Sequence, residues 1–154
     1  MKNIITILAM VTTMAIIYSS PLYSQTVNYK VINTEMYSSA NVTLKLIVYG
    51  KSKKTIDHDA QCAALKVVLF SGCPNTTFTK ALMEDGEKTS AEKYSQYFEN
   101  LYNVRYSDFI ESCEAISAFK RGDKKKGTEY SVVVKVLNLR KDLEKNGIKR
   151  KLGL

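Results

Sequence analysis

The only histidine of the chain, His58, lies four residues before Cys62. A helix would bring both side chains to one face, and a thiol beside an imidazole base is the arrangement that a cysteine nucleophile needs. The same spacing is a common coincidence, however, and a cysteine on a helix often packs as a small apolar side chain. We therefore predict no catalytic residue and expect that the protein is not an enzyme.

Acidic residues on both sides of the histidine raise the question of a metal site. Asp57 and Asp59 are its direct neighbours, but consecutive helical residues point in different directions, whereas a structural zinc site needs four converging ligands. The sequence contains no glycine-rich phosphate loop and no GxSxG or HExxH pattern. We expect neither a metal nor a cofactor, and we interpret these carboxylates as surface groups.

Positive charge is concentrated in the last third of the chain. Residues 120–151 hold 12 basic and 4 acidic side chains, whereas residues 25–119 hold 10 basic and 11 acidic ones. Clustered cations attract polyanions over long distances, and we predict an anion-binding surface there. Its residues are Lys120, Arg121, Lys124, Lys125, Lys126, Arg140, Lys141, Lys149, Arg150 and Lys151. The alternative is that these charges only solvate a hairpin turn, a helix face and a tail.

The periodicity of apolar residues predicts the elements that carry these side chains. A helix is predicted from about residue 55 to residue 71, where apolar residues recur every three or four positions. They are Ile56, Ala60, Ala63, Val67 and Phe70. We expect Thr55 or Asp57 to cap this helix and Gly72 to end it.

Alternating apolar and polar residues predict four strands. The segments are residues 26–31, 41–49, 109–119 and 128–137. The stretch 106–119 is ambiguous between strand and helix, and we favour a strand because residues 121–123 are typical of a turn. Two more helices are predicted, one from the capping box at residues 89–92 and one from Asn138 to about Asn146, with Gly147 as its stop.

The predicted order is β-β-α-α-β-β-α, which indicates an α+β fold. We expect a mostly antiparallel sheet of about four strands with two or three helices packed on one face. The chain has 154 residues, of which 45% are hydrophobic and 25% charged, and this composition excludes collagen-like and fully disordered proteins. Residues 25–154 are expected to form a single domain.

The first 24 residues have the pattern of a secretory signal peptide. A basic residue, Lys2, precedes the uncharged and largely apolar run 4–18, and small residues follow it. We predict cleavage after Ser24 and no transmembrane segment in the remaining chain. An uncleaved anchor is the alternative, but the run is shorter than the roughly 20 residues that a membrane-spanning helix needs. We thus expect an exported protein, either periplasmic or secreted.

Export would allow the cysteines to form disulfides. Cys62 and Cys73 are 11 residues apart, which is about 16 Å along a helix and exceeds the roughly 7 Å that a disulfide spans between Cα atoms. Cys113 can pair with either of them, and we prefer the pair Cys73–Cys113 because Cys73 follows the helix in a loop. The alternative is three free thiols.

Four segments carry a resemblance to known proteins. They are Tyr49-Gly50, the run DAQCAALKVVLFSG at residues 59–72, residues 93–98 and residues 139–148. In this order they resemble an uncharacterised family of small secreted proteins of Bacteroidetes-type bacteria, over residues 40–154. The strand and the alanine-rich helix are also distantly similar to the N-terminal domains of envelope lipoproteins and flagellar-assembly proteins. Neither resemblance brings a catalytic motif, and the chain lacks the lipidation cysteine of the lipoprotein pattern.

These observations predict a non-enzymatic envelope or secreted domain that binds a macromolecular, anionic partner through its basic C-terminal surface. An envelope protein or an acidic glycan is the expected partner, rather than nucleic acid, because the chain is exported. The alternative is a structural or assembly component of the cell envelope that acts by protein–protein contacts. The sequence leaves the oligomeric state open.

Overall fold

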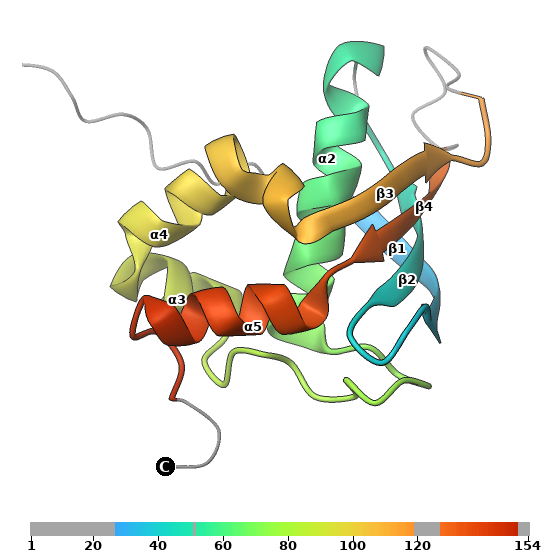
Figure 1. The fold of residues 1–154 in the computed structure, drawn as a ribbon. Coiled ribbons are helices and arrows are strands. Elements are labelled where there is room, and N and C mark those ends of the chain that lie inside the picture. The colour runs from blue at the N-terminus through green and yellow to red at the C-terminus, as the bar shows by residue number, and fades with distance from the viewer. Residues whose placement is uncertain (1–26, 51, 119–126, 151–154) are drawn as a thin grey trace, which may run out of the picture.

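The structure is a computed structural model, and it describes residues 27–50, 52–118 and 127–150. Strands and helices alternate in blocks along these residues, so the predicted α+β class is confirmed (Figure 1). The elements are β1 (Tyr29–Met36), β2 (Val42–Val48), α2 (Lys53–Lys66), η1 (Val67–Ser71), α3 (Glu87–Lys93), α4 (Ser95–Asn100), η2 (Leu101–Arg105), η3 (Tyr106–Phe109), β3 (Ile110–Ala115), β4 (Thr128–Val134) and α5 (Val136–Lys145).

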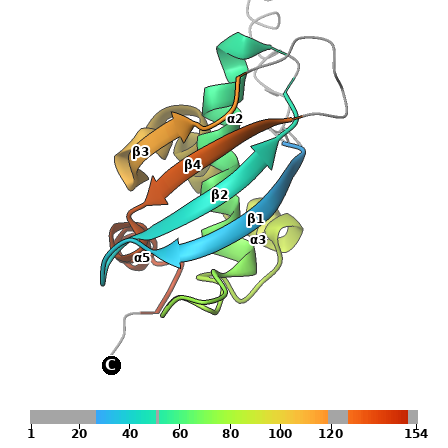
Figure 2. The same cartoon turned by 90° about the vertical axis from the view of Figure 1, so that its right-hand side faces the viewer.

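The four strands form one sheet in the order β1-β2-β4-β3, and every neighbouring pair is antiparallel. β1 and β3 are therefore the two edge strands. Figure 2 shows α2 crossing behind the sheet, while no described helix covers the face toward the viewer. The predicted antiparallel sheet of four strands is thus confirmed, whereas the described residues form four α-helices instead of the two or three that were predicted.

The core lies between β2 and α2. Every second residue of β2, from Val42 to Val48, is fully buried. The helix turns Ile56, Ala60 and the pair Ala63–Ala64 toward the core, and these small side chains let it approach the sheet closely. Burial of a Val or Leu side chain stabilises a fold by about 1.5–3 kcal/mol, so this layer is the main source of stability.

The ends of α2 depend on particular residues. Ser52 caps the helix because its Oγ accepts a hydrogen bond from the backbone N–H of Lys54, so the predicted caps Thr55 and Asp57 were wrong by one turn. The helix continues into the π-helical turn η1 and ends at Gly72, as predicted. Gly72 has a φ of +78°, and a Cβ there would lie 2.3 Å from the carbonyl oxygen of Thr79.

The stretch predicted as a strand at 109–119 begins one residue later and ends earlier, because Tyr106–Phe109 form the short helix η3 and β3 runs from Ile110 to Ala115. Three other predicted boundaries were also wrong. β1 runs from Tyr29 to Met36 rather than over 26–31, because its polar edge residues hide the alternation. α3 begins at Glu87, and Ser90 lies inside it, where its hydroxyl donates to the Asp85 carbonyl instead of capping. β4 ends at Val134, and the buried Val136 already belongs to α5.

Three predictions about helix ends, chain ends and turns have different outcomes. Gly147 has a φ of +69° directly after α5, which confirms it as the stop of that helix. The signal peptide predicted at residues 1–24 and the turn predicted at residues 121–123 both lie outside the described residues. Among the helices that the structure does describe, none is both long and apolar enough to span a membrane.

Candidate functional site

A cleft of about 850 Å³ opens between the loop before α3, the junction of α3 with α4, and the C-terminal segment after α5. We call it the basic cleft. Its lining residues are Leu82, Met83, Glu84, Asp85, Lys93, Tyr94, Arg140, Gly147, Ile148, Lys149 and Arg150. The cleft therefore joins three segments that are far apart in the sequence.

The wall formed by the loop before α3 is fixed by the end of the long helix. The backbone N–H of Leu82 donates to the carbonyl oxygen of Val68 at 3.1 Å, and that of Met83 donates to Leu69 at 2.8 Å. The side chains of Leu82 and Met83 are both buried in the core. This loop is thus held by regular backbone bonds although it has no helix or strand of its own.

The wall formed by the C-terminal segment is held to the first one by a side chain. The chain turns at Gly147, and the backbone N–H of Ile148 bonds the carbonyl oxygen of Leu143 at 3.0 Å. Lys149 then reaches across, and its Nζ donates to the carbonyl oxygen of Leu82 at 2.6 Å. The two walls are therefore connected directly.

Basic side chains outnumber acidic ones in the basic cleft. Lys93, Arg140, Lys149 and Arg150 stand against Glu84 and Asp85. Cations gathered in a concave surface focus their field on the space between them.

The cations of the basic cleft differ in their partners. Arg140 donates to Glu144 at 3.0 Å, one turn along α5. A hydrogen bond with Tyr94 raises the pKa of Lys93 above its ordinary value, and the Lys93 Nζ lies 5.2 Å from the centre of the Tyr94 ring. Arg150 is exposed and forms no ion pair within the described residues. Lys93 and Arg150 are thus the cations best placed to meet a ligand.

The predicted basic surface is partly assembled here. Arg140, Lys149 and Arg150 come together in the basic cleft, whereas the exposed Lys141 lies on α5 outside its lining. Six predicted residues lie outside the described part of the chain: Lys120, Arg121, Lys124, Lys125, Lys126 and Lys151. Sequence reasoning missed Lys93, because no local pattern signals that it lines the same cleft as a segment about fifty residues later.

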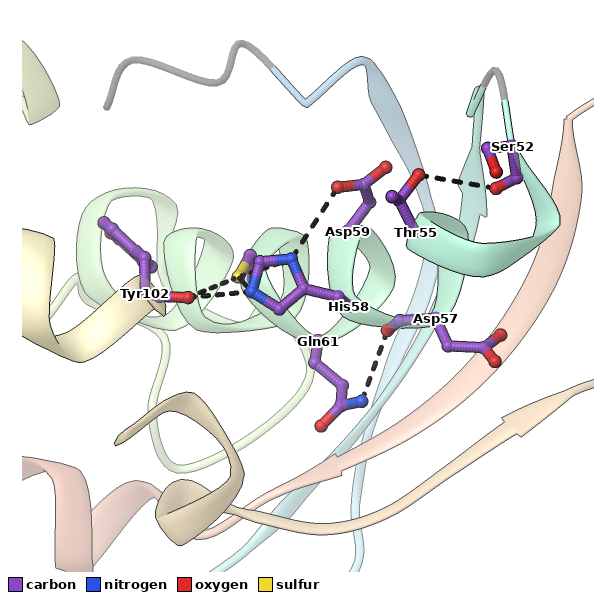
Figure 3. Close-up of polar contacts among 8 residues, drawn as sticks. Ser52, Thr55, Asp57, His58, Asp59, Gln61 and Tyr102 are labelled. Carbon is purple, nitrogen blue, oxygen red and sulfur yellow. Dashed lines mark hydrogen bonds and ion pairs between the residues drawn. The ribbon is translucent and has the colours of Figure 1, made fainter. Parts of the chain in front are cut away.

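The pair His58 and Cys62 forms a second polar cluster, which Figure 3 shows around the carbonyl group of Tyr102. The Nε2 atom of His58 lies 2.8 Å from the Tyr102 oxygen, and the Cys62 Sγ lies 3.6 Å from the same oxygen. The Sγ is also 3.5 Å from Nε2, and the imidazole stacks edge-on against Tyr106. The cluster therefore ties α2 to η2 and η3.

This geometry is that of a structural contact rather than an activated thiol. A carbonyl oxygen can only accept, so Nε2 carries the proton and the lone pair of the ring lies on Nδ1, which is farther from the Cys62 Sγ, at 4.0 Å. Burial, followed by the negative charge of Asp59, raises the pKa of the Cys62 thiol to about 12. Its side chain is only 3% exposed. The thiol thus stays protonated at neutral pH, where a nucleophile needs the thiolate.

The two aspartates beside His58 are not simple surface groups, contrary to the interpretation of the sequence. Asp57 accepts a hydrogen bond from the Tyr130 hydroxyl and links α2 to β4. Burial raises the pKa of Asp59, whose Oδ1 lies 3.9 Å from His58 Nδ1. Across the described residues, no three His, Cys, Asp or Glu side chains group in a way that could hold a metal ion.

All three cysteines are free thiols in the structure, so the predicted bridge Cys73–Cys113 is not formed. Cys73 adjoins Pro74, whose carbonyl accepts a hydrogen bond from Thr34 on β1, whereas Cys113 lies on β3 at the opposite edge of the sheet. Three strand spacings of about 4.8 Å separate these edges, and the total is about twice the span of a disulfide. Sequence spacing could not reveal this separation.

A partly buried ion pair fixes α5, and with it Arg140, against the other helices. Arg105 donates two hydrogen bonds to Asp142, the shorter at 2.7 Å, and the Tyr97 hydroxyl donates a third at 2.8 Å. Burial alone would raise the pKa of Asp142, but the bonds from Arg105 and Tyr97 outweigh it and hold this pKa below its usual value. The ionised carboxylate thus joins α4, η2 and α5.

No protein-family model, curated protein or solved structure matches the chain. The resemblance to small secreted proteins of Bacteroidetes-type bacteria therefore stays a prediction. The function has to be inferred from the site itself.

Proposed function

We propose that the protein is an exported, non-enzymatic domain that binds an anionic glycan in the basic cleft. The observation that carries this proposal is the convergence of Lys93, Arg140, Lys149 and Arg150, from separate segments, on one concave surface. A volume of about 850 Å³ falls within the range of about 300–1,000 Å³ that is typical of small-ligand sites. It suits a short stretch of a longer polymer.

The aromatic side chain in the basic cleft favours a sugar ring. Tyr94 is half-buried and lines the cleft next to Lys93. A tyrosine offers an apolar ring face together with a polar hydroxyl, which matches the mixed surface of a sugar. The carboxylate or sulfate of an acidic sugar would then meet the cations beside it.

The two carboxylates in the cleft favour a glycan over other polyanions. Glu84 and Asp85 lie among the cations, and an ionised carboxylate can only accept hydrogen bonds. Sugar hydroxyls can donate to them all along a glycan, whereas a phosphodiester group by itself offers acceptors alone. A ligand that carries both anionic groups and hydroxyls thus satisfies both signs of charge in the cleft.

Titration calorimetry with a sulfated oligosaccharide tests the proposal. For the paired variant Lys93→Glu/Arg150→Glu we expect Kd to rise at least about tenfold, since two attractive contacts become repulsive. The matched control is Lys54→Glu, an exposed residue in the first turn of α2, at the opposite end of that helix from the cleft. It should change Kd by less than about twofold.

The dependence of Kd on salt concentration supplies a second test of the glycan proposal. Binding by several cations weakens steeply as ionic strength rises. An affinity that does not depend on salt, or an equal loss in the Lys54→Glu control, would overturn the proposal. Binding to anionic lipid vesicles without any binding to the oligosaccharide would also overturn it, because the partner would then be a membrane surface.

A further inference from the structure

The side chain of Arg140 is held at both of its ends. Arg140 lies on α5, whose apolar residues Leu139 and Leu143 are fully buried, so its Cα is fixed to the core. At the other end, its Nε donates to the Oε1 atom of Glu144 at 3.0 Å. Both side chains of this pair are largely buried, with 22% of Arg140 and 17% of Glu144 exposed. The guanidinium group of Arg140 is thus held in one orientation.

Glu144 uses only one of the donors of this guanidinium group. A guanidinium carries N–H groups on Nε and on both terminal nitrogens, Nη1 and Nη2. No residue in the described part of the chain bonds to the Nη1 or Nη2 atom of Arg140. Asp59 and Tyr102 hold the only buried side-chain oxygen or nitrogen atoms without a partner among the described residues. The two terminal nitrogens are therefore not enclosed in the protein, and they are open to a ligand.

The basic cleft is where these nitrogens can meet a ligand. Arg140 lines the cleft, whereas Glu144 does not. Because Glu144 occupies the Nε edge of the guanidinium, the edge formed by Nη1 and Nη2 is the one that Arg140 can offer in the cleft. Two parallel N–H···O bonds from one such edge match two oxygen atoms of a single anionic group. Arg140 is therefore equipped to recognise the shape of an anion as well as its charge.

The other cations of the basic cleft do not have this arrangement. Lys149 uses its Nζ to bind the carbonyl oxygen of Leu82 at 2.6 Å. Lys93 carries a compact ammonium group, which attracts an anion as a point charge without fixing its orientation. Arg150 is exposed, and no carboxylate among the described residues holds its side chain, so it would lose more conformational freedom on binding than Arg140. Arg140 is thus the preorganised donor of the cleft.

From this geometry we propose that Arg140 binds the anionic group of the glycan through both of its terminal nitrogens, and that Glu144 is a positioning residue for it. The group recognised is an oxyanion with two accessible oxygen atoms, which is either the carboxylate of a uronic acid or a sulfate ester. The inference rests on the proposed function, because it assigns roles within the basic cleft. It adds that one cation selects the geometry of the anion, while Lys93 and Arg150 supply attraction.

Replacing arginine by lysine separates geometry from charge. Arg140→Lys keeps the positive charge but loses the paired N–H edge, so we expect the Kd of the purified protein to rise about tenfold. Arg150→Lys makes the same change at the exposed cation of the cleft and should change Kd by less than about twofold. Titration calorimetry measures both variants with an oligogalacturonate, which carries only carboxylates, and with a sulfated oligosaccharide of neutral sugars. The probe that binds more tightly identifies the oxyanion, and the effect of Arg140→Lys should appear with that probe.

Two substitutions of Glu144 test its positioning role. Glu144→Gln and Glu144→Ala both remove the negative charge, but only glutamine keeps an oxygen that can accept the bond from the Arg140 Nε. We expect the Kd of Glu144→Ala to be at least about threefold above that of Glu144→Gln. If Glu144 acted only through its charge, both variants would bind equally. Alanine and glutamine both favour helices, and urea unfolding checks that α5 remains folded in each variant.

The affinity of the wild type separates this inference from the proposed function. In Arg140→Lys the dependence of Kd on salt should match that of the wild type, because the number of charges is unchanged. If the wild type binds a probe but Arg140→Lys loses no more affinity than Arg150→Lys, this inference is wrong and the proposed function stands. The same conclusion follows if Glu144→Ala binds as tightly as Glu144→Gln. If the wild type binds neither probe, the proposed function is wrong and this inference fails with it.

Discussion

Lys149 donates a hydrogen bond from its Nζ to the main-chain carbonyl oxygen of Leu82, 2.6 Å away. Leu82 is in turn bonded through its N–H to Val68 at the end of the long helix. One lysine therefore connects the C-terminal segment to the core and closes one side of the basic cleft. Its charge has a structural use as well as an electrostatic one.

Replacing this lysine should lower stability. Lys149→Met keeps most of the apolar stem but leaves the Leu82 carbonyl without its donor, and we expect the free energy of unfolding to fall by about 1 kcal/mol. Urea denaturation measures this change. Lys145→Met, an exposed residue of the last turn of α5, is the control. An equal loss in the control would show that the bond to Leu82 does not stabilise the fold.

Gly72 is expected to be sensitive to substitution. Gly72→Ala places a Cβ 2.3 Å from the Thr79 carbonyl oxygen at a φ of +78°, and we expect a loss of at least about 2 kcal/mol in the free energy of unfolding. Gly86 has a φ of −63° and no atom within 4 Å of such a Cβ. Gly86→Ala should therefore change stability by less than about 0.5 kcal/mol. Similar results for the two variants in thermal or urea unfolding would contradict this account of the α2 terminus.

Thiol titration distinguishes three free cysteines from a bridge. With an aromatic disulfide reagent and no reductant, three thiols should react in guanidinium, whereas a Cys73–Cys113 disulfide would leave one. In the folded protein only Cys113 should react readily, because Cys62 and Cys73 are buried. This reaction should accelerate as the pH rises, since burial raises the Cys113 pKa to about 11 and the thiolate is the reactive form. Cys113→Ser should remove the fast phase, and rapid labelling of Cys62 in the folded protein would refute its structural role.

The ion pair of Asp142 should make stability depend on pH. The folded protein lowers the pKa of Asp142, so this stabilisation is present above the unfolded value of about 3.9 and is lost as pH falls through the folded value. At pH 7 we expect Asp142→Asn to cost about 1–2 kcal/mol, because Arg105 loses the closer of its two charged partners and keeps only Asp108, at 3.4 Å. The difference from the wild type should shrink below about pH 4.

Urea unfolding at pH 7 and at pH 3 measures this difference. Glu99→Gln, on the exposed surface of α4, removes a carboxylate that forms no ion pair or side-chain hydrogen bond with the described residues, and it should have little effect at either pH. If Asp142→Asn lowers the free energy of unfolding by the same amount at both pH values, the charge of Asp142 does not contribute to stability as proposed.

The long amphipathic elements could be predicted from the sequence. β2, α2 and β4 have unbroken alternation or helical spacing because each buries a full face. β1 was placed too early, since an edge strand with Asn33 and Glu35 among its residues buries too little to show a period. The π-helical turn η2 shifts the spacing of apolar residues and could not be anticipated from a 3.6-residue pattern.

The candidate site was only partly predictable, because it is lined by segments that are far apart in the sequence. Charge counting found Arg140, Lys149 and Arg150 because they are close in sequence, but Lys93 and Tyr94 join them only through tertiary packing. The cap at Ser52 was missed because the apolar stripe of α2 begins one turn after the helix does. The spacing of apolar residues predicts which face of one helix or strand is buried. It does not predict which segments come together to line a cleft.

A titration of the ¹⁵N-labelled protein with a sulfated oligosaccharide, followed by amide chemical shifts, tests the glycan proposal most directly. We expect the largest shifts at residues 82–85, at Lys93 and Tyr94 and at residues 147–150, and their reversal when salt is added. Shifts confined to other surfaces of the domain, or no shifts at an excess of ligand, would show that the basic cleft does not bind an anionic glycan.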